Sequence, residues 1–148
     1  MKRPTKPLAT IGYESATQAE VIGKLRAAAV EVVIDVRAVA ASRRAGFSKT
    51  LLAASLADAG IDYVHFRDLG TPKPGRDAAH KGHVAEMLEI YEAHLAEPAA
   101  QLQLAKATEI ATERKAALLC YEADAAGCHR RIVAGRIHDA TGIEVEDL

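Results

Sequence analysis

Short apolar runs alternate along this chain with longer segments in which apolar residues recur every three or four positions. The runs cover residues 8–12, 30–36, 61–66, 116–121 and 143–145. Most are rich in β-branched side chains and carry few charges, which is typical of strands buried on both faces of a parallel sheet. We therefore expect five short strands.

The segments between these runs predict helices. Thr17 and Glu20 form a capping box, in which the two side chains satisfy free backbone N–H groups at a helix start. Ser48 is placed to cap a second helix that ends at Gly60. Further helices are expected over 84–95, 99–114 and 128–140, whereas the glycine and proline content of 70–75 (GTPKPG) predicts a loop.

Strands separated by helices of this length imply right-handed crossovers and a mostly parallel sheet. The pattern predicts the α/β fold class: a single three-layer domain over residues 8–148, with about five strands flanked by helices. Residues 1–7 are expected to form a flexible N-terminal tail.

The composition is that of an ordinary globular protein. Among 148 residues, 49% are hydrophobic and 26% charged, and the net charge of −1 gives no global field that would draw the chain onto nucleic acid or anionic lipid. Two cysteines do not make a disulfide scaffold, and no apolar run approaches the roughly 20 residues that span a bilayer. We expect a cytoplasmic protein without membrane contact and without a cofactor.

Candidate chemistry gathers where the predicted strands end. In open parallel sheets, ligands bind beyond the carboxyl ends of the strands. Side chains suited to binding or catalysis lie at or just after the ends of four of the runs, and a fifth group opens the last long helix. They are Tyr13 and Glu14, then Asp35, Arg37 and Arg43, then His65, then Cys120 and Glu122, and finally Cys128, His129 and Arg130. We expect these groups to converge on one rim of the sheet.

Asp35 and Arg37 lie two positions apart and so share one face of a strand. A structural ion pair between them and an anion clamp formed by Arg37 are both consistent with this spacing. Arg43 lies in a predicted loop. If Phe47 packs against the domain, the loop would fold back and Arg43 would face the rim; otherwise Arg43 would point into solvent. His65, at a strand end, is a candidate acid or base.

The two cysteines differ in their surroundings. Cys120 falls in a buried strand, where a free cysteine usually behaves as a small hydrophobe. Cys128 opens a helix beside His129 and Arg130, and helix N-termini and neighbouring cations lower a thiol pKa toward the reactive thiolate. A reversible pair with Cys120 is an alternative. No metal is expected, because adjacent Cys128 and His129 rarely ligate one ion and the Cys-x-x-Cys spacing is absent.

Rhodanese-type sulfur transferases and cysteine phosphatases also place a cysteine on a loop between a strand and a helix. The stretch between the two cysteines here is acidic, with Glu122 and Asp124, whereas the loops of those enzymes are rich in arginine and backbone donors. We therefore assign the chain to neither class, although a distant rhodanese-like topology stays open.

Several of these motifs, in this order, resemble the bacterial family of unknown function DUF488. The matching pieces are Thr10–Glu14, Asp35–Arg37, Ser42-Arg43 with Phe47, Gly60–His65, Leu69-Gly70, Leu118–Glu122 and Cys128–Arg130. The resemblance covers nearly the whole chain and implies a small cytosolic α/β protein without a settled activity. It departs at Thr71, where family members often have a second glycine, and this difference bears on substrate specificity.

The leading hypothesis is an enzyme whose rim pocket holds a nucleotide, a nucleic-acid end or a phosphorylated metabolite. Cys128 would be the nucleophile, with Arg37, Arg43 and Arg130 binding the anion. Asp35, His65 and Glu122 would supply acid–base or orienting groups, and the wall of the pocket would include Tyr13, Glu14, Cys120 and His129. Whether the protein is an enzyme stays open, because the same arginines suit a non-catalytic nucleotide- or nucleic-acid-binding module and the cysteines suit a thiol redox switch. The Ala-rich helices would suit a homodimer.

Overall fold

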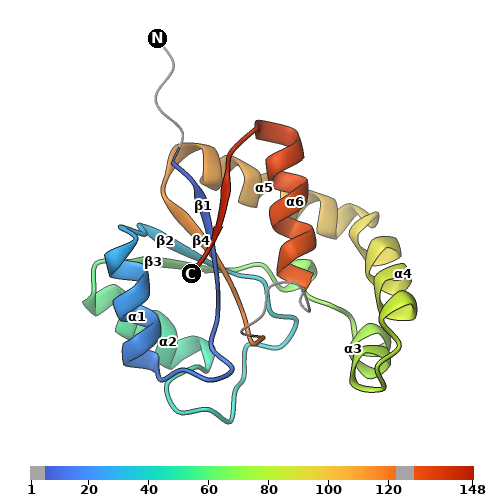
Figure 1. The fold of residues 1–148 in the computed structure, drawn as a ribbon, viewed down its shortest axis with the longest axis horizontal. Helices are drawn as coiled ribbons and strands as arrows, with labels where there is room; N and C mark the ends of the chain where they lie inside the picture. The colour runs from blue at the N-terminus through green and yellow to red at the C-terminus, as the bar shows by residue number, and fades with distance from the viewer. Residues whose placement is uncertain (1–5, 123–128) are drawn as a thin grey trace.

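Five short strands form one sheet in which every neighbouring pair is parallel (Figure 1). The computed structural model describes residues 6–122 and 129–148. The strands are β1 (Leu8–Gly12), β2 (Val32–Asp35), β3 (Asp62–His65), β4 (Ala116–Cys120) and β5 (Val145–Asp147). Their order across the sheet is β3-β2-β4-β1-β5. The predicted α/β class and parallel sheet are confirmed.

Helices connect the strands on both sides of this sheet (Figure 1). They are α1 (Gln18–Ala27), α2 (Lys49–Asp58), α3 (Lys73–His80), α4 (Val84–Leu95), α5 (Pro98–Glu113) and α6 (His129–Thr141), with a short 3₁₀ helix η1 (Arg67–Leu69) after β3. In the described part of the chain, no helix is both long enough and apolar enough to cross a membrane.

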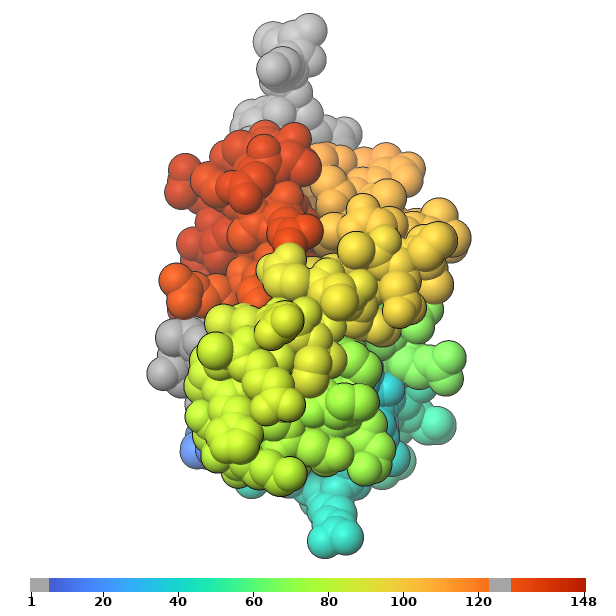
Figure 2. Space-filling view, turned by 90° about the vertical axis from the view of Figure 1, so that its right-hand side faces the viewer, coloured from blue at the N-terminus to red at the C-terminus, as the bar shows by residue number. Residues whose placement is uncertain are grey.

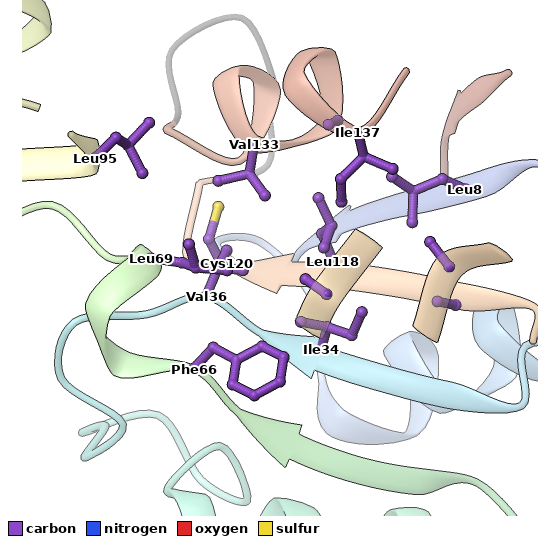
Figure 3. Packing of buried hydrophobic residues seen from close by; sticks show 14 of the residues in the cluster. Leu8, Ile34, Val36, Phe66, Leu69, Leu95, Leu118, Cys120, Val133 and Ile137 are labelled. Atoms are coloured by element: carbon purple, nitrogen blue, oxygen red, sulfur yellow. The ribbon is translucent and has the colours of Figure 1, made fainter. Parts of the chain in front are cut away.

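Two buried clusters show which helices cover which face. Alternate residues of a strand point to opposite faces, so Ile11 and Leu119 pack with α1 and α2, whereas Leu118 packs with α4, α5 and α6. Figure 3 shows Val133 and Ile137 of α6 pointing toward the sheet, where Leu118 and Cys120 of β4 belong to the same cluster. The result is the expected three-layer arrangement, in which strand residues are buried from both sides.

The helix starts follow the predicted chemistry in one case and depart from it in another. Thr17 accepts a hydrogen bond from Glu20 N at 3.1 Å, and the Glu20 carboxylate accepts one from Thr17 N at 3.0 Å, which confirms the capping box. Ser48 occupies the N-cap position of α2 without a side-chain cap bond. Its hydroxyl instead bonds Ser42 O and Ser42 N across the preceding loop, because that loop folds back onto the helix start.

Two predicted boundaries are wrong. The segment 70–75 is not all loop, because α3 begins at Lys73. Proline is tolerated in a first helical turn, where its missing N–H has no intrahelical partner to lose. The last strand runs over Val145–Asp147 rather than 143–145, since Ile143 packs into the core before the chain pairs with β1.

The strand order opens a crevice beside β4. β4 lies between β1 and β2, and both of these strands lead to helices on the α1–α2 face. After β4 the chain instead continues to α6 on the opposite face. Neighbouring connections that leave in opposite directions create the crevice where open α/β sheets bind ligands.

Candidate functional site

A pocket with a volume of about 360 Å³ lies at this crevice, at the carboxyl ends of β1, β2 and β4. Six of the side chains singled out from the sequence line it, namely Tyr13, Arg37, Arg43, Cys120, Glu122 and His129. Its other lining residues are Ala38, Val39, Ala41, Ser42, Thr71, Arg76, Ala79, His80, Met87 and Tyr121. Residues far apart in the sequence therefore meet at the expected rim.

The pocket has a second wall, formed by the α3–α4 hairpin, that the sequence analysis did not foresee. Figure 2 shows this hairpin, in yellow-green and yellow, packed directly against α5 and α6. It contributes Arg76, Ala79, His80 and Met87 to the lining. Gly70 lets the chain reach this wall, because a Cβ on Gly70 would lie 2.1 Å from Ala38 N. The Leu69-Gly70 motif thus marks a close approach of two loops.

Asp35 and Arg37 form a buried ion pair beneath the pocket. Arg37 Nη2 lies 2.7 Å from Asp35 Oδ2, and Arg37 Nε donates to both carboxylate oxygens at 2.9 and 3.0 Å. Arg37 Nη1 also donates to Tyr13 Oη at 3.0 Å and to Phe47 O at 2.7 Å. Most of the guanidinium is therefore engaged by groups of the protein itself.

The surroundings of Arg37 favour its charged form. Burial acts to lower the pKa of Arg37, but the hydrogen bonds and charge of Asp35 outweigh it and raise that pKa above its ordinary value. Tyr63 Oη donates a hydrogen bond to Asp35 Oδ2 at 2.5 Å. The pKa of Tyr63 is raised above its ordinary value, mainly by burial and further by the nearby Asp35 carboxylate. Asp35 itself is fully buried and lies outside the pocket lining.

Two aromatic rings, Tyr13 and Tyr121, line one side of the pocket, and Phe47 supports the first from behind. The Tyr13 ring stacks on Phe47 with centroids 4.2 Å apart and an interplanar angle of 9°. Tyr121 meets Tyr13 nearly at right angles, with centroids 5.4 Å apart. Tyr13 is buried, whereas Tyr121 is 45% exposed, so Tyr121 is the ring of this group that a ligand can reach.

Two histidines hold the backbone that leaves β2. His129 Nε2 donates to Val36 O and His65 Nε2 donates to Arg37 O, each at 2.7 Å. Burial, reinforced by the charge of Arg130, lowers the pKa of His129 to about 4 even though the Val36 carbonyl opposes the change. His129 is therefore neutral near pH 7. His65 lies outside the pocket lining, so its position supports the loop and not a ligand contact.

Arg130 and Cys120 meet beneath the β4 end of the pocket. Arg130 is fully buried, and its Nη1 lies 3.0 Å from Cys120 Sγ and donates to Glu122 O. Cys120 Sγ is also 3.4 Å from Glu122 Oε2. Gly12 leaves room for these contacts, because a Cβ there would lie 1.7 Å from Glu122 O and 2.8 Å from Arg130 Nη1.

The arginines of the β2–α2 loop have different roles. Arg44 donates to Glu14 O at 2.9 Å and to Ala16 O at 2.7 Å, and so fastens the loop to the start of α1. Arg43 is exposed and lines the pocket. Glu14 is exposed and lies outside the pocket lining, and its carbonyl accepts the hydrogen bond from Arg44.

Arg76 and Tyr121 were missed by the sequence analysis. Arg76 Nη1 donates to Thr71 O at 2.8 Å, and Arg76 lines the pocket from α3. The signal for α3 was concealed by two prolines, which read as loop. Tyr121 directly follows a buried strand, and its exposed ring could have been inferred from that end position.

Cys128, the candidate nucleophile, lies outside the described residues, as does any pairing of Cys128 with Cys120. Within residues 6–122 and 129–148, no cluster of three or more His, Cys, Asp or Glu side chains is arranged to hold a metal ion.

Comparison with known proteins identified one family. The model of the family described as "Domain of unknown function DUF488" matches residues 17–137, which is most of the chain. No curated protein matched, and no solved structure did.

Proposed function

We infer the function from the pocket itself, because the chain belongs to the DUF488 family and the description of that family names no activity. We propose that the rim pocket binds a small anionic organic molecule of the nucleotide or phosphorylated-metabolite class. The observation that carries this proposal is the presence of two arginines, Arg43 and Arg76, on different walls of one pocket.

The charges of the pocket favour an anion. Among the described residues, neither Arg43 nor Arg76 forms an ion pair, in contrast to Arg37, which is held by Asp35. Glu122 is the one carboxylate among the described lining residues. A planar guanidinium binds phosphate or carboxylate with two parallel hydrogen bonds. Two such groups facing one cavity supply a local anion site that the net charge of −1 does not reveal.

The size and the apolar part of the lining favour an organic ligand over an inorganic ion. Small-molecule sites are typically concave, with volumes of roughly 300–1,000 Å³, and combine apolar surface with a few polar groups. The pocket of about 360 Å³ lies near the lower end of that range, and Val39, Met87 and Tyr121 contribute its apolar and aromatic surface. A metabolite of mononucleotide size meets both conditions.

The proposal is tested by calorimetric titration of the full chain with guanosine monophosphate and with ribose 5-phosphate. We expect Arg43→Ala and Arg76→Ala each to weaken binding by about tenfold or more, the loss typical of a hydrogen bond to a charged group. Arg67→Ala, an exposed arginine of η1 outside the pocket lining, serves as the matched control and should bind as the wild type does. Equal affinity of all four proteins, or no binding of either ligand by the wild type, would contradict the proposal.

A catalytic role for the same pocket rests on Cys128 as nucleophile. The observation that favours it is the position of the next residue, His129, in the pocket lining. We expect Cys128→Ser to abolish turnover of a bound phosphorylated substrate while leaving its affinity unchanged, because the hydroxyl is a weaker nucleophile than a thiolate. Persistence of turnover in this variant would exclude Cys128 as nucleophile. Binding without turnover in the wild type would identify a non-catalytic module.

A further inference from the structure

The pocket contains two groups that an anion site alone does not need, namely the exposed ring of Tyr121 and the carboxylate of Glu122. We propose that the organic part of the ligand is a nucleobase, which stacks on Tyr121 and presents an amino-bearing edge to Glu122. The inference rests on the proposed function and deepens it, because it names the class of ligand and two specificity-determining residues.

Tyr121 is held in place as a stacking surface. Its neighbour Tyr13 is fixed on one side by Phe47, whose ring lies nearly parallel at 4.2 Å, and at its hydroxyl by Arg37 at 3.0 Å. Tyr121 contacts this fixed ring nearly at right angles. The 45% exposure of Tyr121 leaves aromatic surface open on the pocket side. Bases stack on such rings in a sequence-tolerant way, because every base has a π face.

Arg43 and Arg76 would bind the phosphate of the ligand. The Glu122 carboxylate cannot bind it too, because carboxylate and phosphate are both negatively charged and repel each other. An ionised carboxylate only accepts hydrogen bonds, so its ligand partner must be a donor. Ribose hydroxyls also donate to carboxylates, but guanine presents two adjacent N–H donors, N1–H and the 2-amino group, at the spacing of two carboxylate oxygens. Because Tyr121 and Glu122 both line the pocket, a base stacked on the ring can turn its edge toward the carboxylate. Among the common bases, guanine fits this pair best.

The positive and negative side chains of the pocket come from different elements, and this predicts the orientation of the bound ligand. Arg43 comes from the β2–α2 loop and Arg76 from α3, whereas Tyr121 and Glu122 come from the end of β4. A nucleoside monophosphate separates its anionic and aromatic parts by one ribose, which suits a pocket of about 360 Å³. We therefore expect the phosphate to lie at the arginines and the base at β4.

The test is calorimetric titration of the full chain with guanosine, inosine and uridine monophosphates and ribose 5-phosphate. Inosine monophosphate differs from guanosine monophosphate only by the missing 2-amino group, and we expect it to bind about tenfold more weakly. Ribose 5-phosphate, which lacks a base, should be the weakest ligand.

Three variants at these two residues separate the contributions of the ring and the carboxylate. Tyr121→Ala should weaken guanosine monophosphate by about tenfold or more and leave ribose 5-phosphate unchanged, whereas Tyr121→Phe should keep the wild-type affinity because it keeps the ring. Glu122→Gln should remove the preference for guanosine over inosine monophosphate, because it replaces one acceptor by a donor, while thermal unfolding verifies that the fold is intact.

The two proposals fail in different ways. If ribose 5-phosphate binds as tightly as the nucleotides and depends on Arg43 and Arg76, the nucleobase inference is overturned and the anion site stands. If nucleotides bind better but guanosine and inosine monophosphates bind alike, the role given to Glu122 is overturned. If no phosphorylated ligand binds, both proposals fall together.

Discussion

Arg37 and Asp35 form an ion pair in which the Arg37 side chain is 5% exposed and the Asp35 side chain is not exposed at all. The pair joins the end of β2 to Tyr13 after β1, to Tyr63 in β3 and to the Phe47 carbonyl in the β2–α2 loop. It therefore fixes the floor of the pocket. The sequence left open whether Arg37 binds a ligand or supports the structure, and its contacts favour the structural role.

Removing one member of this pair should be costly. We expect Arg37→Ala to lower the free energy of unfolding by about 3–5 kcal/mol, because the buried Asp35 carboxylate would lose its counter-ion. The measurement is urea unfolding at pH 7 followed by circular dichroism. Arg43→Ala is the matched control, since Arg43 is exposed and should change stability by no more than about 0.5 kcal/mol. A stable Arg37→Ala variant that had lost ligand binding would instead make Arg37 an anion contact.

Gly70 should not tolerate a side chain. A Cβ at this position would lie 2.1 Å from Ala38 N and 2.4 Å from Ala38 Cα, and backbone atoms cannot move aside cheaply. We expect Gly70→Ala to lower the free energy of unfolding by about 2 kcal/mol or more. Gly23→Ala in α1, where nothing lies within 4 Å of the added Cβ, should instead stabilise the protein by about 0.5–1 kcal/mol. Equal effects of the two substitutions would contradict the close approach of the two loops.

His129 should make the stability of the protein depend on pH below neutrality. Its pKa in the folded chain is about 4, against an ordinary value of 6.5, so between these values the unfolded chain binds more protons and stability falls as the pH falls. From pH 7 to pH 5 we expect this residue to account for a loss of about 2 kcal/mol, since each pKa unit corresponds to about 1.4 kcal/mol.

The measurement is urea unfolding at both pH values for the wild type and for His129→Gln, whose amide can still donate to the Val36 carbonyl. The variant should lose less stability on acidification than the wild type does. His80→Gln, which alters an exposed histidine, should behave as the wild type does. An identical pH dependence of wild type and His129→Gln would show that His129 titrates normally in the folded chain.

Much of the layer structure could be read from the sequence because it depends on local patterns. The runs that became β1 and β4 have the predicted starts, and the capping box of Thr17 and Glu20 begins α1 as expected. Two errors have different causes. α3 was hidden by prolines, and Ser48 makes contacts with Ser42 that depend on how a loop folds back, which residue type alone does not specify.

The candidate site was predictable in location and less so in composition. The rule that ligands bind beyond the strand ends directed attention to the rim where Tyr13, Arg37, Cys120 and Glu122 meet. The rule could not distinguish the role of Arg37 from that of Arg43, because both are arginines near one strand end. Only the partners of each guanidinium separate them, and Asp35 engages the first while the second stays at the pocket surface.

By itself, the sequence determined the alternation of strands and helices, the parallel sheet and the rim at which polar groups gather, because hydrophobic periodicity and helix caps act over a few residues. The tertiary structure decided the strand order, with β4 between β1 and β2, and the second wall supplied by α3 and α4. It also decided which charges are paired and which face the pocket. These features depend on contacts between segments distant in the chain, and the packing of the whole domain sets such contacts.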